Sequence, residues 1–109
     1  MTDTLNKLTA DTFEEYIDSD FIVKLLDEGG TESLYPLTLH AVERVGEKER
    51  DMAAHGRESF SLIFKNPEKE RYLMQSTYAL HHDSLGVLHL FLVPLGPRDD
   101  GMYYEVIFT

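Results

Sequence analysis

The chain has 109 residues, the usual size of one domain, and 42% of them are hydrophobic, which is enough to build a core. Twenty acidic against ten basic residues give a net charge of −10, and this argues against nucleic acid or a membrane surface as a partner. The absence of cysteine excludes disulfides, thiolate nucleophiles and cysteine-ligated metal sites. We therefore expect one acidic domain spanning residues 1–109.

Residues 1–7 lack the basic and apolar regions of a signal peptide, and no apolar run approaches the ~20 residues of a membrane helix. We expect a flexible N-terminus over residues 1–7 and a cytoplasmic protein.

The first element expected is a short helix that begins after Thr9, whose hydroxyl can cap free backbone N–H groups. Phe13, Tyr16 and Ile17 share one helical face, because they are three and four residues apart. This pattern predicts an amphipathic helix that ends by Asp18 or Ser19.

Beyond the helix the apolar residues recur with a period of two, which is typical of strands. A charged, irregular stretch over residues 46–58 interrupts this pattern and predicts a mobile loop. The six predicted strands are Phe21–Leu26, Leu34–Val45, Ser59–Lys65, Tyr72–His82, Val87–Leu95 and Met102–Thr109. Short turns between most of them predict a mainly β fold, an antiparallel meander of about six strands that forms a small barrel or a two-layer sandwich.

The hairpin around residues 83–86 allows a prediction of register. A three-residue loop of residues 84–86 would place Gly86 in the left-handed conformation that such loops require. Leu80 would then lie opposite Leu90 and Tyr78 opposite Leu92, so that apolar residues match on one face.

Four segments carry a resemblance to a known family: residues 8–13 (LTADTF), 60–64 (FSLIF), 86–97 (GVLHLFLVPLGP) and 101–105 (GMYYE). With them the chain resembles, over nearly its whole length, a family of small bacterial proteins that is a domain of unknown function. Acidic residues would be expected at His81 and His89, and glycine at Ser76, so the chain departs from the family pattern there. The resemblance implies a β-rich, non-enzymatic protein, encoded beside phage-tail-like proteins, and it supplies no catalytic residue.

His81 and His89 are the candidates for metal binding. In the predicted register they lie opposite each other on the face away from the core, and His55 or His40 could supply a third ligand. Two ligands do not make a site, so we expect no metal and no other cofactor.

The run His81-His82-Asp83-Ser84 contains the residue types of a hydrolase triad. Successive strand residues point to opposite faces, so these side chains do not converge as a triad requires. We expect no catalytic residue and no enzyme.

Apolar residues also occur on the face that should point away from the core. If Leu90 and Tyr104 face inward, the residues that face outward include Phe91, Val93, Tyr103 and Ile107. Either the N-terminal helix covers this face with Phe13, Tyr16 and Ile17, or another chain does.

We accordingly expect a non-enzymatic protein-binding or assembly module that contacts a protein partner, or another copy, through these four residues. The alternative is a small metal- or ligand-binding barrel that uses His81 and His89.

Overall fold

The computed structural model describes residues 8–26, 28–44, 59–68 and 70–108. The predicted flexible N-terminus (residues 1–7) and mobile loop (residues 46–58, with His55) lie outside the described residues. In the described part of the chain, no helix is both long and apolar enough to span a membrane.

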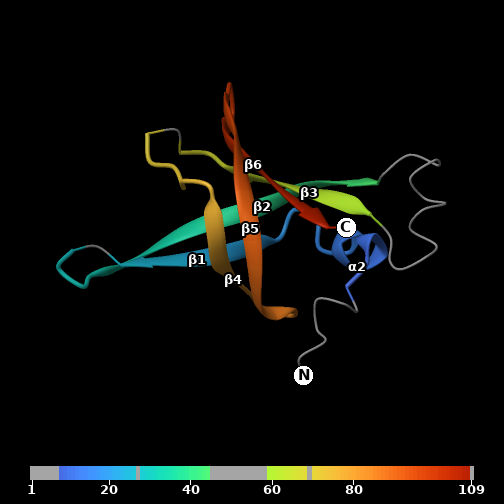
Figure 1. Cartoon of the computed structure of the whole chain (residues 1–109), viewed down its shortest axis with the longest axis horizontal. Coiled ribbons are helices and arrows are strands. Elements are labelled where there is room, and N and C mark those ends of the chain that lie inside the picture. Colours follow the sequence, from blue (N-terminus) through green and yellow to red (C-terminus); the bar gives the residue numbers. More distant parts are fainter. Residues whose placement is uncertain (1–7, 27, 45–58, 69, 109) are drawn as a thin grey trace.

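The described residues form one short helix and six strands (Figure 1). In chain order these are α2 (Ala10–Glu14), β1 (Asp20–Leu26), β2 (Glu32–Arg44), β3 (Phe60–Asn66), β4 (Ser76–His82), β5 (Gly86–Arg98) and β6 (Gly101–Phe108). The strands are antiparallel and close into a barrel in the order β1-β2-β3-β6-β5-β4. The predicted mainly β fold is therefore confirmed. Of the two predicted forms, a small barrel and a two-layer sandwich, the barrel is correct.

Two three-stranded meanders, β1-β2-β3 and β4-β5-β6, make up this barrel. The two meanders join at two places. β3 and β6 pair over the whole length of β3, whereas β1 and β4 pair at only two positions among the described residues. The β1–β2 hairpin and the β5–β6 hairpin extend beyond the barrel as two arms, which point in different directions in Figure 1.

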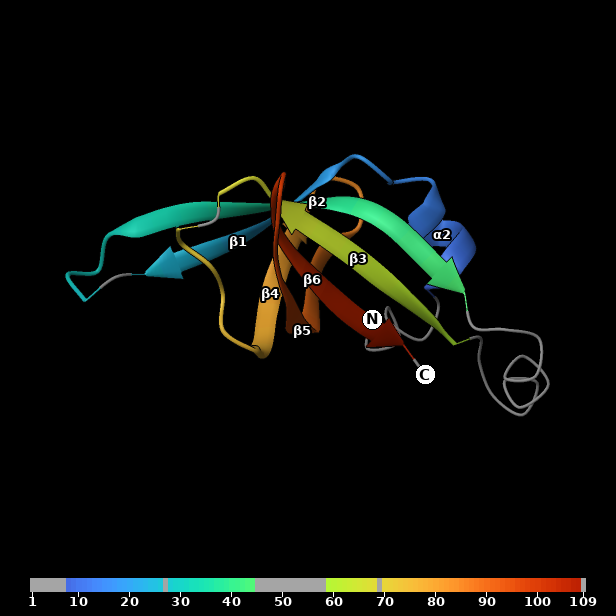
Figure 2. The same cartoon turned by 90° about the horizontal axis from the view of Figure 1, so that it is seen from above.

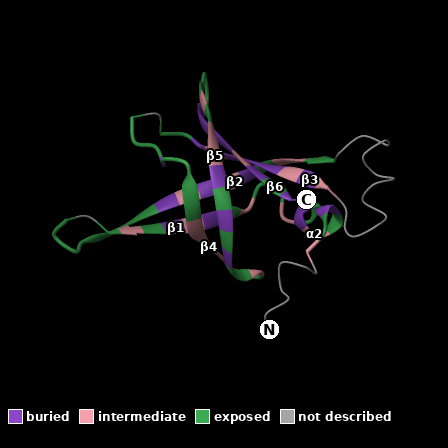
Figure 3. Cartoon of the chain, in the orientation of Figure 1, coloured by how far each residue is buried: buried purple, intermediate pink, exposed green. Residues whose placement is uncertain are grey.

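The core follows from the alternation of side chains along each strand. Leu88, Leu90 and Leu92 of β5 are buried inside the barrel, and the residues between them are more exposed (Figure 3). Each of the other strands contributes inward side chains of the same kind; the largest that are fully buried include Phe21, Tyr35, Leu37, Leu39, Leu62, Phe64, Leu80 and Tyr104.

Helix α2 closes one end of the barrel. Thr9 is its N-cap as predicted, because the Thr9 hydroxyl accepts a hydrogen bond from the Thr12 backbone N–H at 3.3 Å. Phe13 is fully buried against Phe60 and Phe108, with ring centroids 6.0 and 5.5 Å away. Since Phe60 and Phe108 belong to the core, the helix fills the barrel mouth. Of the two alternatives for the outer apolar face, cover by the helix does not hold for Phe13, which packs into the core instead.

The helix is also shorter than its apolar pattern predicted. It ends at Glu14, and Asp18 has a φ of +77°, in the left-handed region that stops a helix. The chain reverses there because the Asp18 backbone N–H donates to Leu39 O at 2.7 Å. Tertiary contact with β2 thus replaces the last predicted helical turn.

The predicted register of the β4–β5 hairpin was wrong by two residues. Leu80 lies opposite Leu88, Tyr78 opposite Leu90, and His82 opposite Gly86. A shift of two preserves which face each side chain points to, so the inward apolar set was still correct. The turn starts one residue earlier than expected because His82 Nδ1 accepts hydrogen bonds from the backbone N–H groups of Ser84 and Leu85.

Candidate functional site

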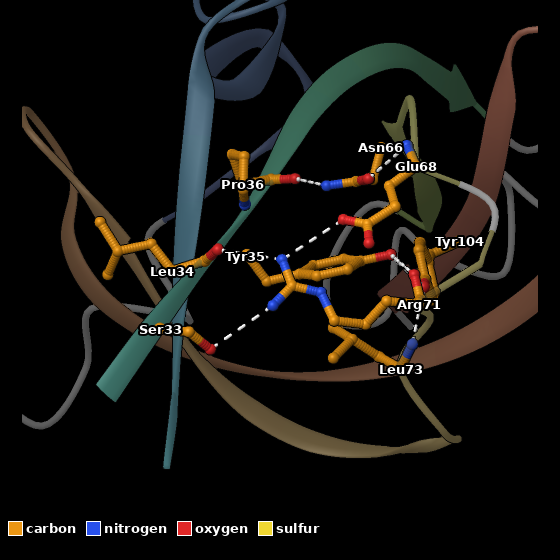
Figure 4. A network of polar contacts seen from close by, with 9 residues as sticks. All are labelled: Ser33, Leu34, Tyr35, Pro36, Asn66, Glu68, Arg71, Leu73 and Tyr104. Carbon is orange, nitrogen blue, oxygen red and sulfur yellow. Dashed lines mark hydrogen bonds and ion pairs between the residues drawn. The ribbon is translucent and has the colours of Figure 1, made fainter. Parts of the chain in front are cut away.

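Two buried tyrosines close the barrel end opposite α2. The Leu73 N–H donates to the Tyr104 hydroxyl at 2.8 Å, and the Tyr35 hydroxyl donates to Arg71 O at 3.1 Å. The two hydroxyl oxygens are 2.7 Å apart, so the Tyr104 hydroxyl donates to Tyr35 (Figure 4). This chain of hydrogen bonds fixes the β3–β4 connection to the barrel, and burial together with the Tyr104 contact raises the pKa of Tyr35 well above its usual range.

Arg71 and Asn66 hold the same connection from outside the core. The Arg71 guanidinium lies over the Tyr35 ring, 5.2 Å from its centroid, and forms an ion pair with Glu68 at 3.4 Å. Asn66 is buried; its Nδ2 donates to Pro36 O at 2.6 Å, and its Oδ1 accepts from the Glu68 N–H at 2.7 Å (Figure 4). The connection therefore has a fixed path over the end of the barrel.

The β5–β6 arm rises beside this connection. A bulge between Pro94 and Gly96, where Gly96 has a φ of +113°, bends β5 into the arm. At the return of the arm, a Cβ on Gly101 would lie 2.3 Å from Asn66 O, so only glycine fits there. The arm and the start of the connection are thus in close backbone contact.

An apolar hollow of about 490 Å³ lies between the arm and the connection. Its lining residues are Tyr72, Pro94, Leu95, Gly96, Pro97 and Met102. Tyr72 and Leu95 are 54% and 41% exposed, whereas Met102 is buried and forms part of the core. Among these lining residues Tyr72 alone has a titratable side chain, so the hollow is suited to hold an apolar group rather than to transfer protons.

Acidic residues lie next to this lining in the sequence. Glu70 is two residues before Tyr72 and Asp99 two residues after Pro97, and both are exposed. Among the described residues, Arg71 contacts Glu68 and Tyr35, and the Arg98 guanidinium lies 4.2 Å from the Tyr103 ring centroid. Charged side chains therefore flank the apolar lining in the sequence.

The four predicted interaction residues have different environments. Phe91 and Ile107 are 49% and 59% exposed on the outer face, as predicted, and Val93 is half-buried opposite Glu105. Tyr103 is only 4% exposed, because Arg98 and His40 cover its ring. The expected availability of Tyr103 was therefore wrong, since a residue on an outer face can be covered by its neighbours.

The Tyr103 hydroxyl also bonds both carboxylate oxygens of Asp100, at 3.0 and 2.9 Å. This hydrogen bond, with a further contribution from Lys65, lowers the pKa of Asp100, and burial raises the pKa of Tyr103. Tyr103 thus has a structural role, bracing the arm.

His81 and His89 do not lie opposite each other. His81 pairs with Val87, and His89 pairs with Ala79, because of the two-residue register shift. Among the described residues no group of three or more potential ligands could hold a metal ion, and His40 lies instead against the Tyr103 ring, with centroids 5.4 Å apart. The geometry on which the metal alternative depended was therefore wrong.

A second hollow, of about 290 Å³, lies on the outer face where β1 meets β4. It is lined by Ile22, Lys24, Leu34, His81, His82, Asp83, Gly86 and Val87. Of these lining residues, only His82 is buried. Its Nδ1 accepts two backbone hydrogen bonds, its Nε2 is 3.0 Å from Ser19 Oγ, and burial lowers its pKa.

Sequence reasoning did not find the hollow beside Tyr72. It assigned Tyr72 to a strand and the residues after Leu95 to a turn, whereas β5 continues to Arg98 and forms the arm. The available signal was the apolar run from Pro94 to Pro97, which is unusual for a solvent-exposed turn.

The model of a family described as a domain of unknown function (DUF6916) matches residues 8–108, nearly the whole described chain. No curated protein and no solved structure matches.

Proposed function

The chain belongs to the DUF6916 family, a domain of unknown function, and we propose that it is a non-enzymatic protein-binding module that takes an apolar segment of a basic partner protein into the hollow beside Tyr72. The observation that carries this proposal is the hollow itself, which has an apolar lining and a volume of about 490 Å³. Its volume is within the range of binding sites for small apolar groups.

The packing supports a binding role because it holds both sides of the hollow in place. The Tyr35–Tyr104 hydrogen bonds fix the connection on one side, and the close contact of Gly101 with Asn66 fixes the arm on the other. A preformed site loses little conformational freedom when a partner binds.

The net charge of −10 and the acidic residues beside the hollow support a basic partner, whose approach they would accelerate. An assembly role among phage-tail-like proteins is the biological setting that the resemblance of the sequence implies. In that setting the partner is a protein surface with an apolar side chain flanked by lysine or arginine.

Partner capture from a lysate of the native cell tests the proposal, using wild-type protein and three variants. Leu95→Asp should abolish capture, because a carboxylate buried unpaired in the contact costs several kcal/mol, roughly. Ile17→Asp, at an exposed position on the opposite end of the barrel, is the matched control and should capture normally. All three variants (Leu95→Asp, Ile17→Asp and Phe91→Asp) should keep the wild-type circular-dichroism melt, since each of these side chains is partly solvated.

Phe91→Asp separates this site from the outer face. If Phe91→Asp abolishes capture and Leu95→Asp does not, partners bind the outer face and the hollow is not the site. If the retained partner is a second copy of this chain, light scattering of the purified protein will show a dimer that Leu95→Asp dissociates.

A further inference from the structure

β1 and β4 close the barrel along only a short part of their length. In the described residues these strands pair at Ile22–His81 and Val23–Leu80, and the two strands then diverge. Residues 24–26 of β1 continue to pair with β2, and residues 76–79 of β4 continue to pair with β5. Figures 1 and 2 show β1 running into its arm while β4 leads away from it. One edge of β4, over residues 76–79, therefore has no partner strand among the described residues.

This edge lacks two of the features by which proteins protect strand edges, charged residues and proline. The nine residues from Tyr72 to Leu80, YLMQSTYAL, contain no acidic residue, lysine, arginine, proline or glycine. Ser76 and Thr77 are exposed, and Met74 just before them is 70% exposed. Residues 24–26 of β1, 32–37 of β2 and 93–98 of β5 also lack a second partner strand among the described residues, but each of these edges contains a charged residue or proline.

From this geometry we infer that the edge of β4 at residues 76–79 accepts an extended segment of a partner protein as an added strand, with basic residues flanking it. Backbone hydrogen bonds from the added strand would satisfy the N–H and C=O groups that face away from β5. Thr77, which lies opposite the half-exposed Phe91 of β5, would be the cross-strand neighbour of an outward side chain of the added strand.

Charge decides between the two sources of such a strand. A second copy would bring together two chains of −10 each, whereas a basic segment meets a complementary field. The inference builds on the proposal of protein binding, but it concerns a surface other than the hollow beside Tyr72.

The inference is tested with a ten-residue probe peptide, Lys-Lys-Val-Thr-Val-Thr-Val-Thr-Lys-Lys. Amide chemical shifts and amide hydrogen exchange of the full chain are measured with and without this peptide. At about millimolar peptide, a concentration suited to weak recognition, shifts should map to residues 76–79 and their amides should exchange at least about tenfold more slowly. A peptide with proline in place of threonine should give no effect, because it cannot donate the required hydrogen bonds. A peptide with glutamate in place of lysine should bind more weakly.

Thr77→Lys places a charge on the edge and should weaken peptide binding severalfold, whereas Ser84→Lys, in the exposed β4–β5 turn, should not. Leu95→Asp should leave peptide binding unchanged, so failure of the hollow and failure of the edge are distinguishable. Shifts elsewhere, or none at 76–79, would overturn the inference. Dimerisation that strengthens with salt and is blocked by Thr77→Lys would show that a second copy occupies the edge, which would also overturn it.

Discussion

The two ends of the barrel are closed by different chemistry. At one end Phe13 of α2 packs on Phe60 and Phe108, and these aromatic rings leave no polar group to satisfy. At the other end Tyr35 and Tyr104 direct their hydroxyls outward, toward the backbone of the β3–β4 connection. The first end is closed by an aromatic side chain, and the second by two tyrosines and the connection that is hydrogen-bonded to them.

This difference explains where the candidate site lies. An aromatic side chain that fills a barrel mouth excludes other molecules because protein interiors are close-packed. A connection held by directed hydrogen bonds can stand away from its neighbours, and here it leaves the hollow beside Tyr72. Variants at the two ends should therefore differ in both stability and function.

Removal of the Phe13 ring should have the largest effect on the free energy of unfolding. Phe13→Ala should lower the free energy of unfolding by about 3–5 kcal/mol, because Phe13 is fully buried and its loss leaves a cavity between two other rings. Chemical denaturation measures this loss. Ile17→Ala, which truncates an exposed residue just after the helix, is the control and should cost far less. Equal effects would mean that α2 does not close the barrel.

Gly101→Ala should have the next largest effect, at the hydrogen-bonded end. The new Cβ would meet Asn66 O at 2.3 Å, and the φ of +145° is unfavourable for alanine, which together should cost at least about 1–3 kcal/mol. Gly86→Ala is the matched control, since its φ is +78° but nothing lies within 4 Å of the added Cβ. Thermal melts in which Gly86→Ala is the more destabilised variant would contradict the close contact of arm and connection.

Tyr104→Phe should cost about 1–3 kcal/mol, because it leaves the buried Leu73 N–H without its acceptor. The variant should also lose partner capture, since the connection that carries Tyr72 is no longer fixed. Denaturation of Tyr104→Phe, Tyr35→Phe and the double variant measures the coupling. Strictly additive losses would show that the two hydroxyls act independently.

His82 should produce a smaller, pH-dependent effect. Its pKa is lowered in the folded state by burial, so between the folded value and the ordinary value near 6.5 the unfolded chain binds more protons. The contribution of neutral His82 to the free energy of unfolding is therefore fully present above pH 6.5, and it is lost as the pH falls below 6.5.

Denaturation at several pH values should show this loss in the wild type and a reduced loss in His82→Gln. His89→Gln, at an exposed position on β5, is the control and should retain the wild-type dependence. The same pH profile in His82→Gln and wild type would contradict the assignment to His82.

Some features of this protein follow from sequence alone because they depend on short-range chemistry. The period of two predicted the strands and the inward side of β5, and Thr9 predicted the start of α2. The outward positions of Phe91 and Ile107 followed from the same alternation. These properties are set by backbone geometry and by residues close in the chain.

Other features required the tertiary structure, because they depend on residues far apart in the chain. The end of α2 depends on Leu39, the burial of Tyr103 on Arg98 and His40, and the requirement for glycine at position 101 on Asn66. A register shift of two residues leaves the apolar pattern unchanged, so the pattern could not show that His81 and His89 are not opposite. The hollow beside Tyr72 and the open edge of β4 arise from how the two meanders meet, and no local pattern specifies that.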